Sequence, residues 1–107
     1  MHYAADVAKL FVKAIDVPFE GAEVYNIRGS VVDMEEVVAA IETAAPELRG
    51  RITHEAASLP FPDGQDDRRL QALLGPFDYT PLPSGVAATV ATFKAALADG
   101  RLNAGDI

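Results

Sequence analysis

The stretch EVYNIRGSVVDMEEVVAAIETAAP, residues 23–46, contains the two kinds of local structure that set the predicted fold class. Its first part, residues 23–28, alternates polar and apolar side chains with β-branched and aromatic members, which predicts a short strand. In its second part Asp33 is followed three residues later by Glu36, a spacing typical of a helix capping box. Pro46 ends this helix, and its apolar face comprises Met34, Val37, Val38, Ile41 and Ala45.

A second amphipathic helix is predicted over residues 3–16, before Pro18. Apolar side chains recur there at steps of three and four residues, which indicates one buried stripe. Lys9, Lys13 and Asp16 would face water. The predicted stripe comprises Val7, Leu10, Phe11, Ala14 and Ile15.

Two more helices are predicted in the second half of the chain. A short one is predicted to be capped by Asp66 or Asp67, to carry Leu70, Leu73 and Leu74, and to end at Gly75, where glycine permits the turn that closes a helix. The last one is expected to begin with Ser84 as its N-cap and to end at Gly100. Its predicted apolar face comprises Val86, Val90, Phe93 and Leu97.

The remaining segments complete a prediction of the α+β class, with about four helices and two short strands. The second strand is predicted at residues 51–55, and a loop with two prolines and an Asp-Gly pair at residues 58–65. One domain is expected over residues 1–100, followed by a frayed tail at residues 101–107. Two strands alone form only a marginal sheet. The predicted sheet is therefore incomplete.

Composition excludes several classes of protein. The chain has 9 basic and 16 acidic residues, a net charge of −7, so a basic surface for nucleic acid is not expected. No apolar run approaches the roughly 20 residues that cross a bilayer, and no membrane association is predicted. Cysteine is absent, which excludes disulfides and thiolate chemistry. Because no secretory signal is visible either, a cytoplasmic protein is expected.

No motif for catalysis, metal binding or cofactor binding is found. The two histidines, His2 and His54, occur in no metal-binding spacing. There is no glycine-rich phosphate loop, no nucleophile elbow and no tyrosine followed four residues later by lysine. We therefore predict no catalytic residues, no metal site and no cofactor bound by this chain alone.

The order of several short motifs carries more information than any one of them. Together these motifs resemble the carboxy-terminal, substrate-binding part of an NAD-dependent epimerase/dehydratase of the extended short-chain dehydrogenase/reductase family. The resemblance spans residues 2–102. The motifs are His2-Tyr3-Ala4-Ala5-Asp6-Val7-Ala8, Val24-Tyr25-Asn26-Ile27, Glu35-Glu36-Val37-Val38, Asp66 to Leu74-Gly75, and Thr80-Pro81-Leu82 followed by Gly85-Val86 and Thr89-Val90.

This resemblance implies a partner. In that family the amino-terminal half is a Rossmann domain that holds NAD(P) and carries the glycine-rich turn and the Tyr-x-x-x-Lys pair. The present chain would then be a lobe that binds a nucleotide-sugar and is not catalytic without a Rossmann half. A strand at residues 24–27 would complete the larger sheet.

The resemblance also suggests three substrate-binding residues. Tyr3 would lie at the floor of the substrate cleft, or simply pack at a helix entry. Phe61 would contact a base or sugar face, or pack on the lobe itself. Asp66 corresponds to the family's aspartate before the Leu-Gly helix, either as a ligand contact or as a cap. Structural roles are expected for Asp6, as a helix cap, and for Asn26, at the strand end.

One departure from the family pattern concerns the loop before Asp66. Nucleotide-sugar members usually carry there an arginine that holds a diphosphate through a bidentate contact. Between Ile52 and Gln65 this chain has no arginine or lysine, and Arg68 and Arg69 follow only on the predicted helix.

A different class of function remains open. An unpaired strand edge tends to pair with another chain. A non-catalytic interaction module could therefore form a homodimer by pairing residues 24–27 of two copies.

Overall fold

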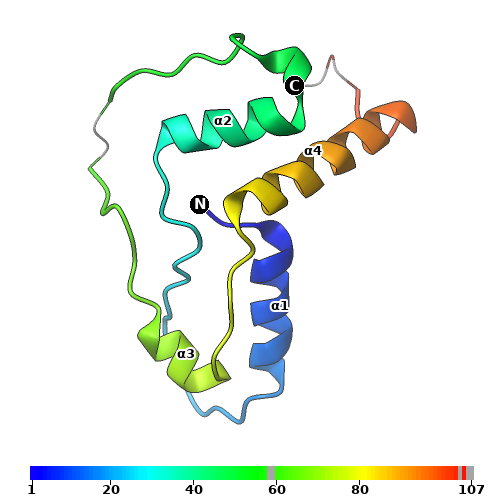
Figure 1. Cartoon of the computed structure of the whole chain (residues 1–107). Helices are drawn as coiled ribbons and strands as arrows, with labels where there is room; N and C mark the ends of the chain where they lie inside the picture. Colours follow the sequence, from blue (N-terminus) through cyan, green and yellow to red (C-terminus); the bar gives the residue numbers. More distant parts are fainter. Residues whose placement is uncertain (58–59, 104, 106–107) are drawn as a thin grey trace. The chain divides into compact units, whose positions relative to one another are not determined.

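The computed structural model describes all residues except 58–59, 104 and 106–107. The described residues form four α-helices, α1 (Ala4–Ile15), α2 (Met34–Ala44), α3 (Arg68–Leu74) and α4 (Leu82–Ala98), and a 3-10 helix, η1 (Pro46–Leu48) (Figure 1). None of them forms a β-strand. The predicted α+β class is therefore wrong, and the described part of the chain is all-helical.

Both predicted strands are irregular backbone. Residues 23–28 and 51–55 adopt no ladder. A strand exists only when its backbone pairs with a neighbour, and the two segments belong to different compact units of the chain. Both strand predictions are therefore wrong, because an alternation of polar and apolar side chains does not supply a pairing partner.

The chain divides into two compact units. The first unit comprises Met1–Val32 and Ala57–Thr80, and the second comprises Asp33–Ala56 and Pro81–Ile107. The first unit thus holds α1 and α3, and the second holds α2, η1 and α4.

In the first unit, α1 packs against α3. Leu10 and Leu70 are buried together with two carboxylates, Asp6 and Asp67. The ring of Phe77 meets the ring of Tyr79 edge to face, with centroids 5.4 Å apart, a favourable aromatic geometry. The interior of this unit therefore combines a small apolar core with buried carboxylates.

The buried face of α1 is not the predicted one. Leu10 is buried, but Phe11 is 67% exposed and Ile15 is 81% exposed. Lys13 is exposed, as predicted, and its Nζ lies over the Phe77 ring at 5.9 Å from the ring centroid. The rotation of the helix about its axis is set by Asp6 and Leu10, because these are the residues that meet the rest of the unit.

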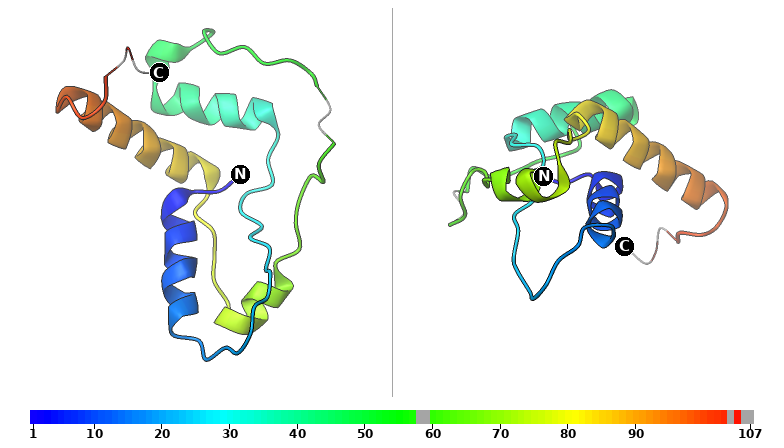
Figure 2. Two further views of the ribbon diagram at one scale, coloured as in Figure 1. Left: turned by 180° about the vertical axis from the view of Figure 1, so that it is seen from behind. Right: turned by 90° about the horizontal axis from the view of Figure 1, so that it is seen from below.

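In the second unit, α2 and α4 lie side by side (Figure 2). Apart from Val37 on α2, the buried residues are small: Ala40 on α2, Ala45 just after it, and Gly85 and Ala96 on α4. Small side chains let two helix backbones approach closely. The predicted apolar face of α4 is wrong in part, because Phe93 is 54% exposed and Leu97 is 45% exposed.

The ends of α4 are defined differently from each other. The predicted cap at Ser84 is wrong, since the helix begins at Leu82 with Pro81 as N-cap. Proline is well tolerated in a first helical turn, which Pro83 occupies. At the other end, Gly100 has φ +66° and Arg101 N donates to Ala96 O at 2.8 Å, closing the helix as predicted.

Two predicted segments extend beyond what is described. The loop at residues 58–65 includes Ser58 and Leu59, which lie outside the described residues, and residues 60–65 have no regular structure. Of the tail at residues 101–107, residues 104, 106 and 107 lie outside the described part. Among the described residues, no helix has the length and apolar character to span a membrane.

The capping box of α2 is confirmed and supports a stability prediction. Glu36 N donates to Asp33 Oδ1 at 2.8 Å, and Asp33 N donates to Glu36 Oε2 at 3.0 Å. Asp33→Ala removes the cap, so we expect a loss of about 1 kcal/mol in the free energy of unfolding, measured by urea denaturation. Glu35→Ala, in the same first turn, is the control and should change stability by less than about 0.5 kcal/mol. Equal effects of the two substitutions would contradict the capping role.

Candidate functional site

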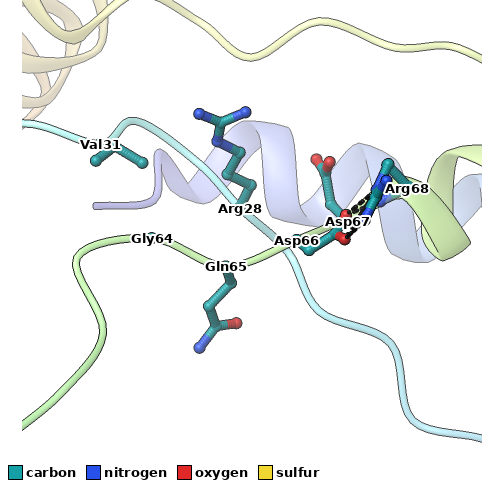
Figure 3. Close-up of a pocket in the computed structure, with 7 residues that line it drawn as sticks. All are labelled: Arg28, Val31, Gly64, Gln65, Asp66, Asp67 and Arg68. Atoms are coloured by element: carbon teal, nitrogen blue, oxygen red, sulfur yellow. Dashed lines mark hydrogen bonds and ion pairs between the residues drawn. The ribbon is translucent and has the colours of Figure 1, made fainter.

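A hollow of about 520 Å³ lies in the first unit, between the end of the 23–28 segment and the start of α3. Its volume is within the range of small-molecule sites, about 300–1,000 Å³. The hollow is open to solvent, and five of its seven lining residues carry polar or charged side chains (Figure 3). The lining residues are Arg28, Val31, Gly64, Gln65, Asp66, Asp67 and Arg68.

Asp66 forms an ion pair with Arg68 at the edge of this hollow. Arg68 Nε donates to both carboxylate oxygens, at 2.9 and 2.8 Å, and Arg68 Nη2 donates to Oδ2. Backbone N–H of Arg68 donates to Oδ1 at 3.0 Å, which places Asp66 just before α3. These bonds, the side-chain ones above all, lower the pKa of Asp66 to about 2. Asp66 is therefore a carboxylate whose negative charge is paired with the guanidinium of Arg68.

Asp67 has the opposite environment. It is 5% exposed, and its Oδ2 accepts from the Tyr79 hydroxyl at 2.7 Å while Oδ1 accepts from Gln71 Nε2 at 3.2 Å. The same Tyr79 oxygen accepts from the backbone N–H of Arg28 at 3.0 Å. Burial, and then the bond to Asp67, raises the pKa of Tyr79. A buried carboxylate thus positions a tyrosine, which in turn positions the backbone of Arg28.

Asp6 forms a second polar cluster with Thr80, within the same unit. Its Oδ2 accepts from Thr80 N at 2.7 Å and its Oδ1 accepts from Thr80 Oγ1 at 2.8 Å. The predicted capping role of Asp6 is wrong, because Tyr3 is the N-cap residue of α1 and no side chain caps this end. The backbone bond from Thr80, against the opposing effect of burial, lowers the pKa of Asp6. Asp6 anchors the chain after α3 to α1.

The three predicted substrate residues do not meet at one place. Asp66 lines the hollow, whereas Phe61 is 72% exposed and lines none of the described hollows. Tyr3 is half-buried at the start of α1, where its carbonyl accepts from Asp6 N at 3.1 Å. Asn26, expected at a strand end, donates instead to the carbonyl of Asp66 at 3.4 Å.

Sequence reasoning missed Arg28, and it missed Tyr79 as its support. Arg28 lines both the hollow beside Asp66 and a neighbouring one of about 320 Å³. In the sequence, only the position of Arg28 sets it apart: it follows the alternating polar and apolar residues 23–27 and precedes Gly29. Gly29 has φ +63°, and a side chain there would meet Met1 O at 2.2 Å, so the backbone after Arg28 is tightly constrained.

Comparisons with other proteins add no relationship: no protein-family model, no curated protein and no solved structure matches this chain. Within the described part of the chain, no group of three or more His, Asp or Glu residues is placed to hold a metal ion. What the described hollow offers chemically is a set of hydrogen-bonding and charged groups around an open space, which suits binding of a polar ligand.

Proposed function

We propose that this chain is the substrate-binding lobe of an NAD(P)-dependent epimerase/dehydratase-like protein of the extended short-chain dehydrogenase/reductase class. In this proposal it binds a nucleotide-sugar, relies on a Rossmann half for NAD(P), and is not catalytic by itself. A cytoplasmic location is part of the proposal, since a chain without cysteine lacks the disulfides typical of oxidising compartments. The motif order between residues 2 and 102 is what suggests the family.

The exposed face of α1 is the observation that carries the proposal. Phe11, Val12 and Ile15 are 67%, 62% and 81% exposed, and they recur at the spacing of one helix face. An apolar stripe of this kind marks an interaction surface more often than a free surface. A substrate-binding lobe that packs against the Rossmann half of an enzyme needs an apolar face of this kind for the contact.

Thermal unfolding of the chain with candidate ligands tests the proposal. We expect UDP-glucose or dTDP-glucose to raise the melting temperature, while NAD⁺ and NADP⁺ leave it unchanged. A ligand at a hundred times its dissociation constant adds about 2.7 kcal/mol, which is readily measured. Free glucose is the control for nonspecific sugar effects. Stabilisation by NAD(P)⁺, or none by any sugar nucleotide, would overturn the proposal.

The homodimeric module is the second candidate. Its predicted interface, the edge of a strand at residues 24–27, is wrong, because these residues form no strand. The exposed face of α1 offers a different surface through which two copies would pair. Two substitutions on this helix separate the candidates. Ile15→Asp changes an exposed residue, so we expect an unfolding free energy within about 0.5 kcal/mol of the native chain. Leu10→Asp is the matched control, and because Leu10 is 6% exposed it should unfold the first unit.

Light scattering on the native chain and on Ile15→Asp gives the measurement. The substrate-lobe proposal predicts a monomer at all concentrations for both proteins. A dimer that dissociates on dilution, and that Ile15→Asp abolishes, would favour the homodimeric module.

A further inference from the structure

Arg28 is held in place by its backbone while its side chain lies free. Its N–H donates to the Tyr79 hydroxyl at 3.0 Å, and Tyr79 donates to the buried Asp67. Two residues further on, Ser30 N donates to Met1 O at 2.8 Å. The segment that carries Arg28 is therefore bonded on both sides, which reduces the entropy lost when a ligand is bound.

Among the charged residues that line the hollow, only Asp66 and Arg68 form an ion pair with each other, within the described part of the chain. Asp66 is matched by Arg68, and Asp67 accepts from Tyr79 and Gln71. Arg28 takes part in none of the ion pairs formed by the described residues. Figure 3 shows its guanidinium apart from the Asp66–Arg68 pair, with Gln65 pointing to the opposite side.

The chemistry of this side chain selects the ligand. A guanidinium presents a planar set of N–H donors that matches two oxygens of a phosphate. The charge of Arg28 contributes to the lowered pKa of Asp66, but no hydrogen bond joins the two side chains, and the Asp66 oxygens accept from Arg68. An arginine in this setting is suited to an oxyanion that enters from solvent.

We propose that Arg28 binds a phosphate group of a ligand that occupies the hollow between residues 28–31 and 64–68. This inference rests on the proposed function and deepens it, because the phosphate would be that of the sugar nucleotide's diphosphate. Arg28 then provides the cationic group that the loop between Ile52 and Gln65 lacks.

Titration with inorganic pyrophosphate, UDP and uridine, followed by amide shifts in NMR spectra, tests the inference. The native chain should bind pyrophosphate and UDP, with shifts at residues 28–31 and 64–68, and should not bind uridine. Arg28→Gln should weaken binding by at least about tenfold, as expected for losing a charge-assisted hydrogen bond. Arg28→Lys keeps the positive charge but lacks the planar pair of N–H donors. Its affinity should therefore lie between those of the native chain and Arg28→Gln.

Arg49→Gln is the matched control, since it removes the same charge from an exposed arginine of the second unit. It should change affinity by less than about twofold, because Arg49 does not line the hollow and an exposed charge is screened. The inference would be overturned if Arg28→Gln and Arg49→Gln lost affinity equally, or if Arg28→Gln bound as tightly as the native chain. It would also be overturned if the native chain bound neither pyrophosphate nor UDP. Unchanged melting temperatures confirm that the variants are folded.

UDP-glucose separates this inference from the proposed function. If the native chain and Arg28→Gln bind it equally, the proposed function stands and Arg28 has no part in it. If pyrophosphate binding requires Arg28 but no sugar nucleotide binds, Arg28 holds a free phosphate and the proposed function is wrong.

Discussion

Replacing Asp6 with alanine is expected to lower the free energy of unfolding of the first unit by about 2–3 kcal/mol. Asp6 is 8% exposed, and it accepts from both the backbone N–H and the hydroxyl of Thr80. Both bonds are charge-assisted, and no other group replaces the carboxylate once it is removed. Urea unfolding followed by circular dichroism measures the loss.

Asp16→Ala is the control for this prediction. Asp16 is exposed at the C-terminal end of α1, where a negative charge opposes the helix dipole. We expect its removal to change stability by less than about 0.5 kcal/mol. If Asp6→Ala is equally mild, the bonds to Thr80 do not stabilise the fold.

The effect of Asp6 should also depend on pH. The pKa of this carboxyl lies below its ordinary value of 3.8, chiefly because the Thr80 N–H bonds to the charged form. A lowered native pKa stabilises the fold above the unfolded value, and this contribution disappears as the pH falls through the native pKa. The stability difference between the native chain and Asp6→Ala should therefore be full at pH 6 and shrink below pH 3.8.

Tyr79→Phe is the second substitution with a large expected effect, a loss of about 2 kcal/mol. It keeps the ring that packs against Phe77 but removes one hydroxyl with two partners. Asp67, which is 5% exposed, then loses a donor at 2.7 Å, and Arg28 N loses its acceptor. Most of the loss in unfolding free energy comes from the buried carboxylate of Asp67, which is left with one hydrogen bond fewer.

Tyr25→Phe is the matched control, because the Tyr25 hydroxyl donates to Glu23 on the surface at 2.9 Å. We expect an unchanged urea midpoint for that variant. Tyr79→Phe should in addition weaken pyrophosphate binding, through displacement of the Arg28 backbone. A stable Tyr79→Phe protein with native affinity would show that the bonds from Tyr79 to Asp67 and Arg28 neither stabilise the unit nor position Arg28.

Helix positions could be predicted because their signals are local. The capping box between Asp33 and Glu36, the stop at Pro46 and the glycines at 75 and 100 act within one or two turns of backbone. Steric and hydrogen-bonding preferences at this range do not depend on the rest of the chain.

The candidate site could be predicted only in part. Asp66 was expected and does line the hollow, but Arg28 was not weighed, since nothing near it in sequence indicates a ligand. Its support comes from Tyr79, 51 residues away. Phe61 was expected beside the ligand and lines none of the described hollows, because an aromatic residue in a proline-rich loop does not reveal where that loop lies.

The sequence by itself determined the capped start of α2 and the glycines that follow α3 and α4, since caps and breakers act on neighbouring residues. Tertiary structure alone decided which face of α1 is buried, because Leu10 and Phe11 are equally apolar and only packing distinguishes them. It also decided that Asp6 bonds Thr80 rather than its own helix end, and that residues 23–28 form no strand. Each of these outcomes depends on a partner distant in sequence, and a local pattern contains no information about that partner.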